Sequence, residues 1–440
     1  MSSETEMLVL DEKDAGYWVY RGEGAANIVL SYTGSSPLFV GKVLRLQKAL
    51  KGKANNDSSC LSEHERLLWS CYGEIVSAPT KEIAGRLFVQ HVMSPLLGAK
   101  HVDAGIQVRA SKKFLLEIEK NIESSRPSSR ISASKVDTLC ESALVISDHS
   151  LFPSGNPKED ICISVEIKPK CGFLPSSRYV VKRNAIKRRV TRFRMHQVLK
   201  FQNHEIEDLS DYDPLDLFSG SQERIRRALK ALFSNPQNNL RVFLNGSLVL
   251  GGLGGIASPT AASTEETVED MLKLIIQAND NSHTECFIEL LAETISKSGV
   301  LKQLLDAQEL DKYDIEGAVH AYYNIISEPC PVCRELDRGN ESSEQWSDLH
   351  SILLDESLEI VRNFLTAATA KDCSLMFCLK QKKDGETCIP HDTVSLQSTN
   401  QVFAYKAFFI DLDMKPLEKM EYYYELDQKI VRQYIEANAG

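Results

Sequence analysis

The sequence predicts an α+β protein of two lobes, a small N-terminal lobe with an antiparallel sheet and a larger, mainly helical C-terminal lobe. Three observations support this fold class. The chain has 440 residues, which is too long for one simple hydrophobic core. Its first part holds short segments rich in aromatic and β-branched residues, and its later part holds apolar residues at helical spacing. We place the boundary between lobes 1–148 and 149–440.

Strand patterns dominate the predicted small lobe. Residues 17–21 and 27–32 flank a glycine turn and predict a hairpin, and residues 38–46 predict a third strand followed by a lysine-rich loop at 48–59. Residues 62–75 predict a helix, because Ser62 can cap it and Glu65 three residues later completes a capping box. Residues 141–152 and 161–169 predict a second pair of strands.

Amphipathic helices dominate the predicted large lobe. In the segment 221–235, Ile225, Leu229 and Leu232 repeat at helical spacing. Similar patterns predict helices at 267–278, 285–310, 314–327, 349–369 and 418–437, and short strands at 373–381 and 402–413. The small-residue segment 251–267 predicts a linker. Its glycines do not predict a phosphate loop, because no lysine follows them at the required spacing.

Composition narrows the class of protein. Charged residues make up 25% and hydrophobic residues 42%, and no apolar run reaches the roughly 18 residues of a membrane span. The acidic N-terminus lacks a secretory signal, and eleven cysteines are too sparse for a disulfide scaffold. We therefore expect a monomer in the cytoplasm or nucleus. The net charge of −10 disfavours nucleic acid as a required partner, although the stretch 178–200 holds nine basic residues and no acidic one.

The glycine turn "YRGEGAAN" lies between two predicted strands and resembles the lid that kinases lay over nucleotide phosphates. Only Gly22 and Gly24 are present, so an ordinary hairpin turn is the alternative. In the next strand, Lys42 and Arg45 stand where a phosphate-binding cation would lie. Charges that protect an edge strand are the alternative interpretation there.

The stretch "EIKPK" follows an apolar run at residues 166–170. Strand alternation places Glu166, Lys168 and Lys170 on one face, and Pro169 marks a strand end because it lacks a backbone donor. Two lysines at a strand end next to a cleft are typical of phosphate binding.

Carboxylates follow another apolar strand near the C-terminus. Asp411 and Asp413 in "IDLDMKP" offer the oxygen ligands that Mg²⁺ prefers. Upstream, Asp372 lies at a predicted break between helix and strand. It is either structural or able to orient and deprotonate an attacking hydroxyl.

A metal pattern lies in the large lobe. Cys330 and Cys333 form a C-x-x-C pair, with His320 before it and His350 after it. Two cysteines and two histidines predict a tetrahedral zinc site, and a closed set of four ligands predicts a structural role. The alternative is two buried thiols with two unrelated histidines.

Seven segments resemble, in order, the inositol-pentakisphosphate 2-kinase family: "RGEGAANIV", "VLRLQK", "MSPLLGAKHVDAG", "EIKPK", "RFRMHQVLK", "KDCSLMF" and "IDLDMKPLEKMEYYYELD". The resemblance spans nearly the whole chain. It implies a two-lobed, kinase-like α+β fold with a zinc site. It also implies an ATP-dependent enzyme that phosphorylates the 2-hydroxyl of inositol 1,3,4,5,6-pentakisphosphate, giving inositol hexakisphosphate (phytate).

The resemblance also implies the roles of individual residues. The nucleotide would contact Val19, Tyr20, Arg21, Gly22, Gly24, Asn27, Val40, Asp148, His149, Glu166, Lys168 and Arg241. The inositol phosphate would contact Arg45, Arg130, Lys170, His196, Lys200, Asn238, Asn239, Lys415, Lys419 and Tyr423. Asp372 would act on the 2-hydroxyl, Lys168 would assist transfer, and Asp411 would hold Mg²⁺. Zinc would bind His320, Cys330, Cys333 and His350. Lys419 stands where the family pattern has arginine, which disfavours a bidentate phosphate contact there.

Two alternatives remain open at this point. The chain could be a kinase for another small molecule or for proteins, although it lacks the H-R-D-x-x-x-x-N and D-F-G motifs. It could also be a zinc-containing nucleic-acid-binding protein, which the C-x-x-C pair and the basic stretch would suit. The acidic net charge weighs against the second alternative.

Overall fold

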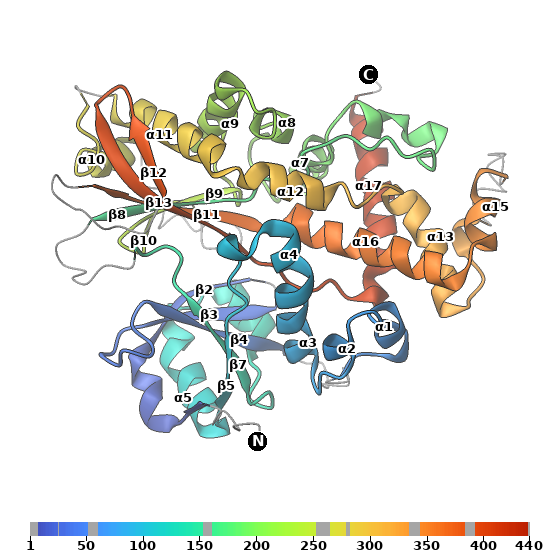
Figure 1. Cartoon of the computed structure of the whole chain (residues 1–440), viewed down its shortest axis with the longest axis horizontal. Helices are drawn as coiled ribbons and strands as arrows, with labels where there is room; N and C mark the ends of the chain where they lie inside the picture. The colour runs from blue at the N-terminus through green and yellow to red at the C-terminus, as the bar shows by residue number, and fades with distance from the viewer. Residues whose placement is uncertain are drawn as a thin grey trace.

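The structure is a computed structural model, and it describes residues 8–24, 26–51, 60–152, 161–251, 265–278, 282–333, 344–382 and 392–438. Two separate sheets and many helices make it a mixed α/β structure, compatible with the α+β class (Figure 1). Most of the predicted linker 251–267 lies outside the described residues. Of the helices in the described ranges, none combines the length and apolarity needed to cross a membrane.

The first sheet has the strand order β1-β5-β7-β4-β3-β2, with β6 paired to β4. Its strands are β1 Val9–Leu10, β2 Trp18–Glu23, β3 Asn27–Tyr32, β4 Lys42–Leu50, β5 Ile106–Ala110, β6 Ser134–Val136 and β7 Ser142–Ser147. All described pairs are antiparallel except β1 with β5. Helix α5 (Lys112–Ile122) packs on this sheet and buries Phe114, Leu115 and Ile118 in its core. The predicted hairpin is confirmed as β2 and β3.

Two predictions in this part are wrong. Strand β4 runs from Lys42 to Leu50, so it begins and ends later than the predicted strand 38–46 and includes residues 48–50 of the predicted loop. The reason is that the Lys48 side chain is buried against Glu23 instead of solvated. The predicted helix 62–75 is two short helices, α1 (Glu63–Leu68) and α2 (Gly73–Val76), separated by a turn after Trp69. The capping box of Ser62 and Glu65 is confirmed.

The second sheet has the strand order β10-β9-β8-β11-β13-β12, and all its pairs are antiparallel. Its strands are β8 Cys162–Ile167, β9 Leu240–Leu244, β10 Ser247–Leu250, β11 Ser374–Gln381, β12 Asp392–Leu396 and β13 Gln401–Ile410. The predicted pairing of residues 141–152 with 161–169 is therefore wrong, because β7 and β8 lie in different sheets. All six residues of β8 are buried, as suits a central strand whose partners come from distant segments.

The helices that follow β8 cover this sheet and extend beyond it (Figure 1). They are α7 Arg192–Gln202, α8 Pro214–Leu217, α9 Gln222–Ser234, α10 Glu265–Leu272, α11 His283–Ser298, α12 Val300–Gln308, α13 Asp314–Ile326, α15 Glu344–Ser351, α16 Leu354–Asp372 and α17 Met420–Ala437. The predicted helix 285–310 is split at Gly299, whose φ of 69° is left-handed. The predicted helix 349–369 is likewise two helices, α15 and α16.

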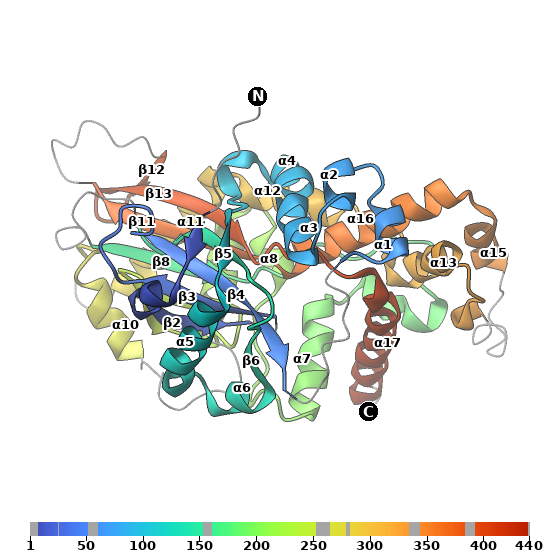
Figure 2. The same ribbon diagram turned by 90° about the horizontal axis from the view of Figure 1, so that it is seen from below.

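Early helices pack on the second core, not on the first sheet. The segment with α1, α2, α3 (Lys81–Phe88) and α4 (Ser94–Leu97) buries Leu68, Trp69, Phe88, Met93 and Leu97 in the cluster that contains β8 and α16. Helix α4 lies beside α12, and α1 contacts α16 (Figures 1 and 2). Residues 61–97 therefore come between two strands of the first sheet in the sequence, but pack in the core that contains the second sheet. The boundary at 148/149 stays a prediction.

Candidate functional site

The predicted "EIKPK" residues lie at the end of β8. Glu166 pairs in register with Arg241 of β9, and Arg241 Nη1 donates to both carboxylate oxygens of Glu166 at 3.1 and 3.0 Å. The strand ends at Ile167, and Lys170 has a left-handed φ of 62°. Lys170 therefore lies beyond the strand, and the prediction that strand alternation puts it on one face with Glu166 and Lys168 is wrong. The orientation of its side chain follows from its left-handed backbone and from its contacts.

Lys170 and Lys415 bracket the carboxylate of Asp372, the last residue of α16. Lys170 Nζ lies 3.4 Å from Asp372 Oδ1, and Lys415 Nζ donates to Oδ2 at 2.9 Å. Burial raises the pKa of Asp372, but Lys170, Lys415 and Lys168 outweigh it and hold this pKa below its usual range. Burial lowers the pKa of Lys170 to about 8, with Asp372 opposing the shift. Asp372 is thus ionised at neutral pH, and the ammonium of Lys170 loses its proton just above neutral pH.

A second charged group surrounds Asp411, directly after β13. Lys168 Nζ lies 3.8 Å from Asp411 Oδ2, and the backbone of Asp411 is left-handed with φ of 61°. Burial raises the pKa of Asp411, Lys168 lowers it, and the negative charge of Glu166 raises it again. Asp413 forms an ion pair with Arg45 of β4 and so connects the first sheet to this segment. The predicted charged residues from "EIKPK", "IDLD" and β4 therefore converge.

Helices α7 and α17 lie side by side and contribute further residues (Figure 2). Burial and the nearby Arg192, Lys200 and Lys170 lower the pKa of His196 to about 3, so its imidazole is neutral. Burial also lowers the pKa of Lys200, whose ammonium interacts with Lys168 and Asp372. On α17, burial raises the pKa of Tyr423 to about 12, and Asp372 adds to this. These three predicted residues are near the Asp372 group.

Asp148 and His149, two predicted nucleotide contacts, lie in the segment between β7 and β8, which belong to different sheets. Asp148 Oδ1 accepts from the amide and the hydroxyl of Ser150, and Ser150 Oγ accepts from Arg21 Nη2 at 2.6 Å. Arg21 Nη1 lies 3.8 Å from Asp148 Oδ2, and its guanidinium lies over the ring of Phe243. Asp148 N donates to the carbonyl of Gly41, so the backbone pairing of β7 with β4 extends one residue beyond Ser147 and Lys42.

His149 is buried and stacks on Phe408, with ring centroids 3.9 Å apart. Its Nε2 lies 3.5 Å from Asp103 Oδ2. Asp103 was not predicted as a site residue, because its contact with His149 joins segments that are far apart in the sequence.

The glycine turn between β2 and β3 is held by a buried charge network that the sequence did not predict. Glu23 accepts from Lys48 Nζ at 2.6 Å, from Arg126 Nε at 2.9 Å and from Arg126 Nη2 at 3.0 Å. Lys48 also donates to the carbonyl of Gly24 at 2.9 Å, and Gly24 N donates to the carbonyl of Asn27. The turn is therefore fixed by ion pairs in addition to its backbone bonds.

The remaining predicted contact residues differ in exposure. Val19 and Val40 are 44% and 55% exposed, so both side chains are accessible to another molecule. Asn238 and Lys419 are exposed, and Arg130 is half-buried in the short helix α6 (Ser128–Ala133) near Tyr20. Other predicted residues are Gly22, half-buried in β2, and Asn239, whose side chain donates to the carbonyl of Lys168 at 3.0 Å. Their contacts with ligands stay predictions.

Part of the basic stretch 178–200 is neutralised within the protein. Lys187 is buried and its Nζ lies 2.5, 3.0 and 2.7 Å from carboxylate oxygens of Asp314, Glu316 and Asp427. These three carboxylates are close enough to one another to hold a metal ion, but the ammonium already lies among them. Arg192 also pairs with Asp427, at 3.2 Å. The stretch therefore supplies fewer free charges than its composition indicates.

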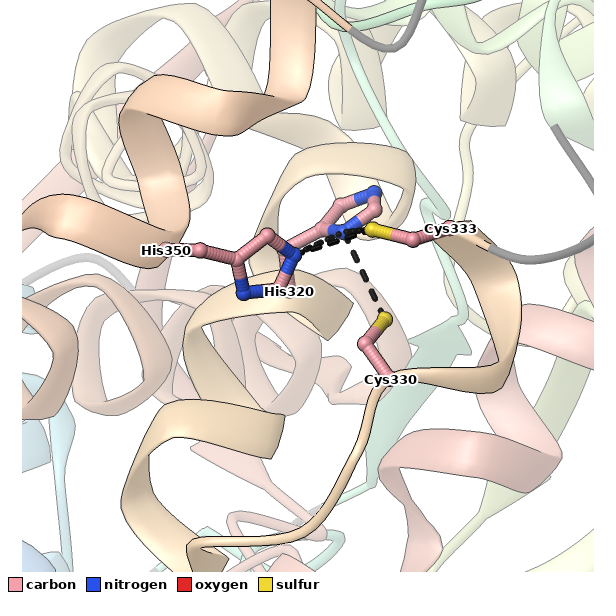
Figure 3. Close-up of side chains that lie close together, drawn as sticks. All are labelled: His320, Cys330, Cys333 and His350. Carbon is pink, nitrogen blue, oxygen red and sulfur yellow. Dashed lines mark hydrogen bonds between the residues drawn. The ribbon is translucent and has the colours of Figure 1, made fainter. Parts of the chain in front are cut away.

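The four predicted metal ligands come together (Figure 3). All four ligand atoms lie within 4.8 Å of one another, with His320 Nδ1 3.1 Å from His350 Nε2. Cys333 Sγ lies 3.3 Å from His320 Nδ1 and 3.0 Å from His350 Nε2, and Cys330 Sγ lies 3.5 Å from His320 Nδ1. His350 is oriented through Nδ1 by Asn324 Oδ1 at 3.1 Å.

These distances are close to those around a tetrahedral metal ion, and the separations of 3.1 and 3.0 Å to His350 Nε2 are shorter than ideal. Zn–N bonds of about 2.0–2.1 Å and Zn–S bonds of about 2.3 Å imply N···N and N···S separations of roughly 3.3–3.6 Å. The hydrogen bond from Cys333 lowers the pKa of Cys330 to about 4, with burial opposing the shift and His320 adding to it. Such a thiolate is the form that binds metals.

Comparison with known proteins decides the family. A model of the family described as inositol-pentakisphosphate 2-kinase matches residues 20–429. The chain belongs to the inositol-pentakisphosphate 2-kinase family. It is 51% identical over 432 residues to an inositol-pentakisphosphate 2-kinase of Arabidopsis thaliana, covering 97% of this chain and 95% of that protein.

Other inositol-pentakisphosphate 2-kinases agree over the same length. One from Oryza sativa subsp. japonica is 53% identical over 431 residues, covering 97% of this chain and 95% of that protein. One from Danio rerio is 31% identical, covering 97% and 94%. The family resemblance inferred from short motifs is thus confirmed over nearly the whole chain.

Proposed function

We propose that this chain transfers the γ-phosphate of ATP to the 2-hydroxyl of inositol 1,3,4,5,6-pentakisphosphate, giving inositol hexakisphosphate. Membership of the kinase family supports the reaction class. The observation that carries the site assignment is the pair of charged groups at the end of β8. Lys168 and Lys170, two residues apart in one segment, pair with Asp411 and Asp372 respectively, so that there is one pair for each phosphate-bearing substrate.

The nucleotide binds, in this proposal, between the first sheet and the edge of the second. This corresponds to a two-lobed, kinase-like arrangement with lobes 1–148 and 149–440. The ion pair of Arg45 with Asp413 and the hydrogen bond of Arg21 to Ser150 support it, because each joins the two parts. The fixed glycine turn covers the phosphates, and the exposed Val19 and Val40 contact the base.

Asp372 orients the 2-hydroxyl and receives its proton as the new bond to phosphorus forms. In the free protein its low pKa makes it a weak base, because Lys170 and Lys415 pair with it. The phosphates of the bound cyclitol compete for these two ammonium groups and so raise the basicity of Asp372 in the complex. Lys170 and Lys415 then neutralise phosphate charge next to the reacting hydroxyl.

Asp411, with Asp413 near it, would hold Mg²⁺. The fit is supported by the donor set, because Asp411 and Asp413 lie two residues apart directly after β13 and carboxylate oxygens are the ligands that Mg²⁺ prefers. When bound, the ion would supply positive charge that neutralises the phosphates of the nucleotide. Lys168, 3.8 Å from Asp411, acts beside it as a point charge on the transferring phosphate.

The cluster of His320, Cys330, Cys333 and His350 holds zinc with a structural role. All four ligand positions come from protein, so none is left for a reacting water. The cluster connects α13 to α15 across residues that lie outside the described ranges. Bound zinc would therefore stabilise this end of the helical part.

The proposed setting is a monomer in the cytoplasm or nucleus. Eleven cysteines in 440 residues are too sparse for a disulfide scaffold, which suits a reducing compartment.

The test is a transfer assay with radiolabelled ATP, Mg²⁺ and a panel of inositol phosphates that differ in free hydroxyls. We expect transfer to inositol pentakisphosphate with a free 2-hydroxyl, and loss of at least about a hundredfold in kcat in Asp372→Ala with an unchanged melting temperature. A folded Asp372→Ala variant with full activity would refute the role of this carboxylate.

A further inference from the structure

Three consecutive carbonyl oxygens at the end of β8 are each held by a buried side chain from a different part of the chain. The donors are Asn239 Nδ2 to Lys168 O at 3.0 Å, the Tyr212 hydroxyl to Pro169 O at 2.8 Å, and Gln308 Nε2 to Lys170 O at 2.9 Å. The donor residues are only 3%, 3% and 0% exposed. Buried polar groups are normally hydrogen-bonded, and here three of them come from different segments and hold successive carbonyls, so together they fix the backbone at this point.

Gln308, the last residue of α12, connects this segment to α16. Its Nε2 donates to the carbonyls of Lys170 and Ala370, the second at 3.1 Å, and its Oε1 accepts from Gly172 N at 2.8 Å. Ala370 lies two residues before Asp372 in the last turn of α16. One side chain therefore fixes the separation between the backbone that carries Lys170 and the backbone that carries Asp372.

This fixing is needed because the backbone of Lys170 is in an unfavourable conformation. Its φ of 62° lies in the left-handed region, which a lysine adopts only at a cost. Such a conformation persists where the surroundings determine it. Here the two flanking carbonyls, of Pro169 and Lys170, are the ones that Tyr212 and Gln308 hold.

We propose that Gln308, assisted by Tyr212, is a positioning residue for phosphate transfer. It touches neither substrate, and it acts by holding Lys170 Nζ at its distance of 3.4 Å from Asp372. The inference rests on the proposed function, in which these two groups handle the acceptor. It predicts that loss of the Gln308 amide lowers kcat, because a small displacement of groups that act on the transition state costs rate.

Gln308→Met and Tyr212→Phe test this inference, because each keeps the approximate shape of the side chain and removes its hydrogen bonds. Gln401→Met is the matched control. Gln401 is also buried, and its amide also makes three hydrogen bonds, to Gln277 N, Ile275 O and Thr399 Oγ1. It lies at the start of β13, at the opposite end of that strand from the proposed site.

We expect Gln308→Met and Gln401→Met to lower the melting temperature by similar amounts, because each removes three buried hydrogen bonds. Measured well below both melting temperatures, kcat should fall by about 10- to 100-fold in Gln308→Met alone, with KM for ATP changed by less than about threefold. Tyr212→Phe removes a single hydroxyl and should lower kcat by about three- to tenfold. It decides the question if Gln308→Met does not fold.

Variants of Gln308 and Tyr212 with kcat within about twofold of the wild-type value would overturn the inference. So would an equal loss of kcat in Gln401→Met, because the effect would then follow stability alone. A wild-type protein that transfers no phosphate would overturn the proposed function and this inference together. An active wild type with unaffected variants overturns the positioning role only.

Discussion

Removal of the Lys170 ammonium should weaken use of the inositol phosphate and spare use of ATP. At the observed 3.4 Å, the attraction between Lys170 and Asp372 is about 1 to 5 kcal/mol for effective dielectric constants of about 80 to 20. Both side chains are partly exposed, so the lower end applies. A phosphate that takes the place of Asp372 gains a charge-assisted hydrogen bond worth roughly 1.5–3 kcal/mol.

That energy converts to a rise of roughly 10- to 150-fold in KM for inositol pentakisphosphate in Lys170→Ala, with the lower end favoured. Asp372 keeps Lys415 as a partner, so the melting temperature should change by less than about 2 °C. Steady-state kinetics with each substrate varied in turn, and Lys302→Ala as a control at an exposed helical ion pair, provide the measurement. Lys168→Ala should show the reverse pattern. A Lys170→Ala variant whose main defect is in KM for ATP would refute the division of roles.

Three further predictions follow from charges and ligands. Burial lowers the pKa of Lys170 to about 8, and the side chain must be protonated to bind phosphate. We therefore expect kcat/KM for the inositol phosphate to fall as the pH rises above about 8, and Lys170→Arg to shift this fall to higher pH. Identical pH profiles of the wild type and Lys170→Arg would contradict this prediction. Cys330→Ser should lower bound zinc from about one per chain, by metal analysis, and lower the melting temperature more than kcat. Glu23→Ala leaves the buried charges of Lys48 and Arg126 without their carboxylate and should lower the free energy of unfolding by about 3–5 kcal/mol. Glu141→Ala, at an exposed ion pair, is the control and should cost less than about 1 kcal/mol. Equal losses for the two variants in denaturant titration would contradict this prediction.

Features set by local chemistry were predictable from the sequence. The β2–β3 hairpin follows from apolar strands around a glycine turn, and the Ser62 cap follows from a glutamate three residues later. The spacing of Cys330 and Cys333 limits them to one turn of chain, and the structure brings His320 and His350 to them.

Features set by distant contacts were not predictable. Residues 161–169 read as a strand, but its partners β9 and β11 lie roughly 80 and 210 residues further on. Lys48 read as part of a solvated loop, because nothing local indicates that Glu23 and Arg126 bury its charge. Gln308 ends an amphipathic helix like any other polar residue. Its function as a connector depends on carbonyls 138 and 62 residues away in the chain.

The identity of the product formed from inositol 1,3,4,5,6-pentakisphosphate tests the central claim most directly. The only free hydroxyl of this acceptor is at position 2, so transfer to it gives a product with six separate phosphate monoesters. Phosphorus NMR of the purified product should show monoester signals only and should match inositol hexakisphosphate. Signals of a diphosphate linkage would mean that the acceptor is an existing phosphate, and absence of any product with ATP and Mg²⁺ would contradict the account as a whole.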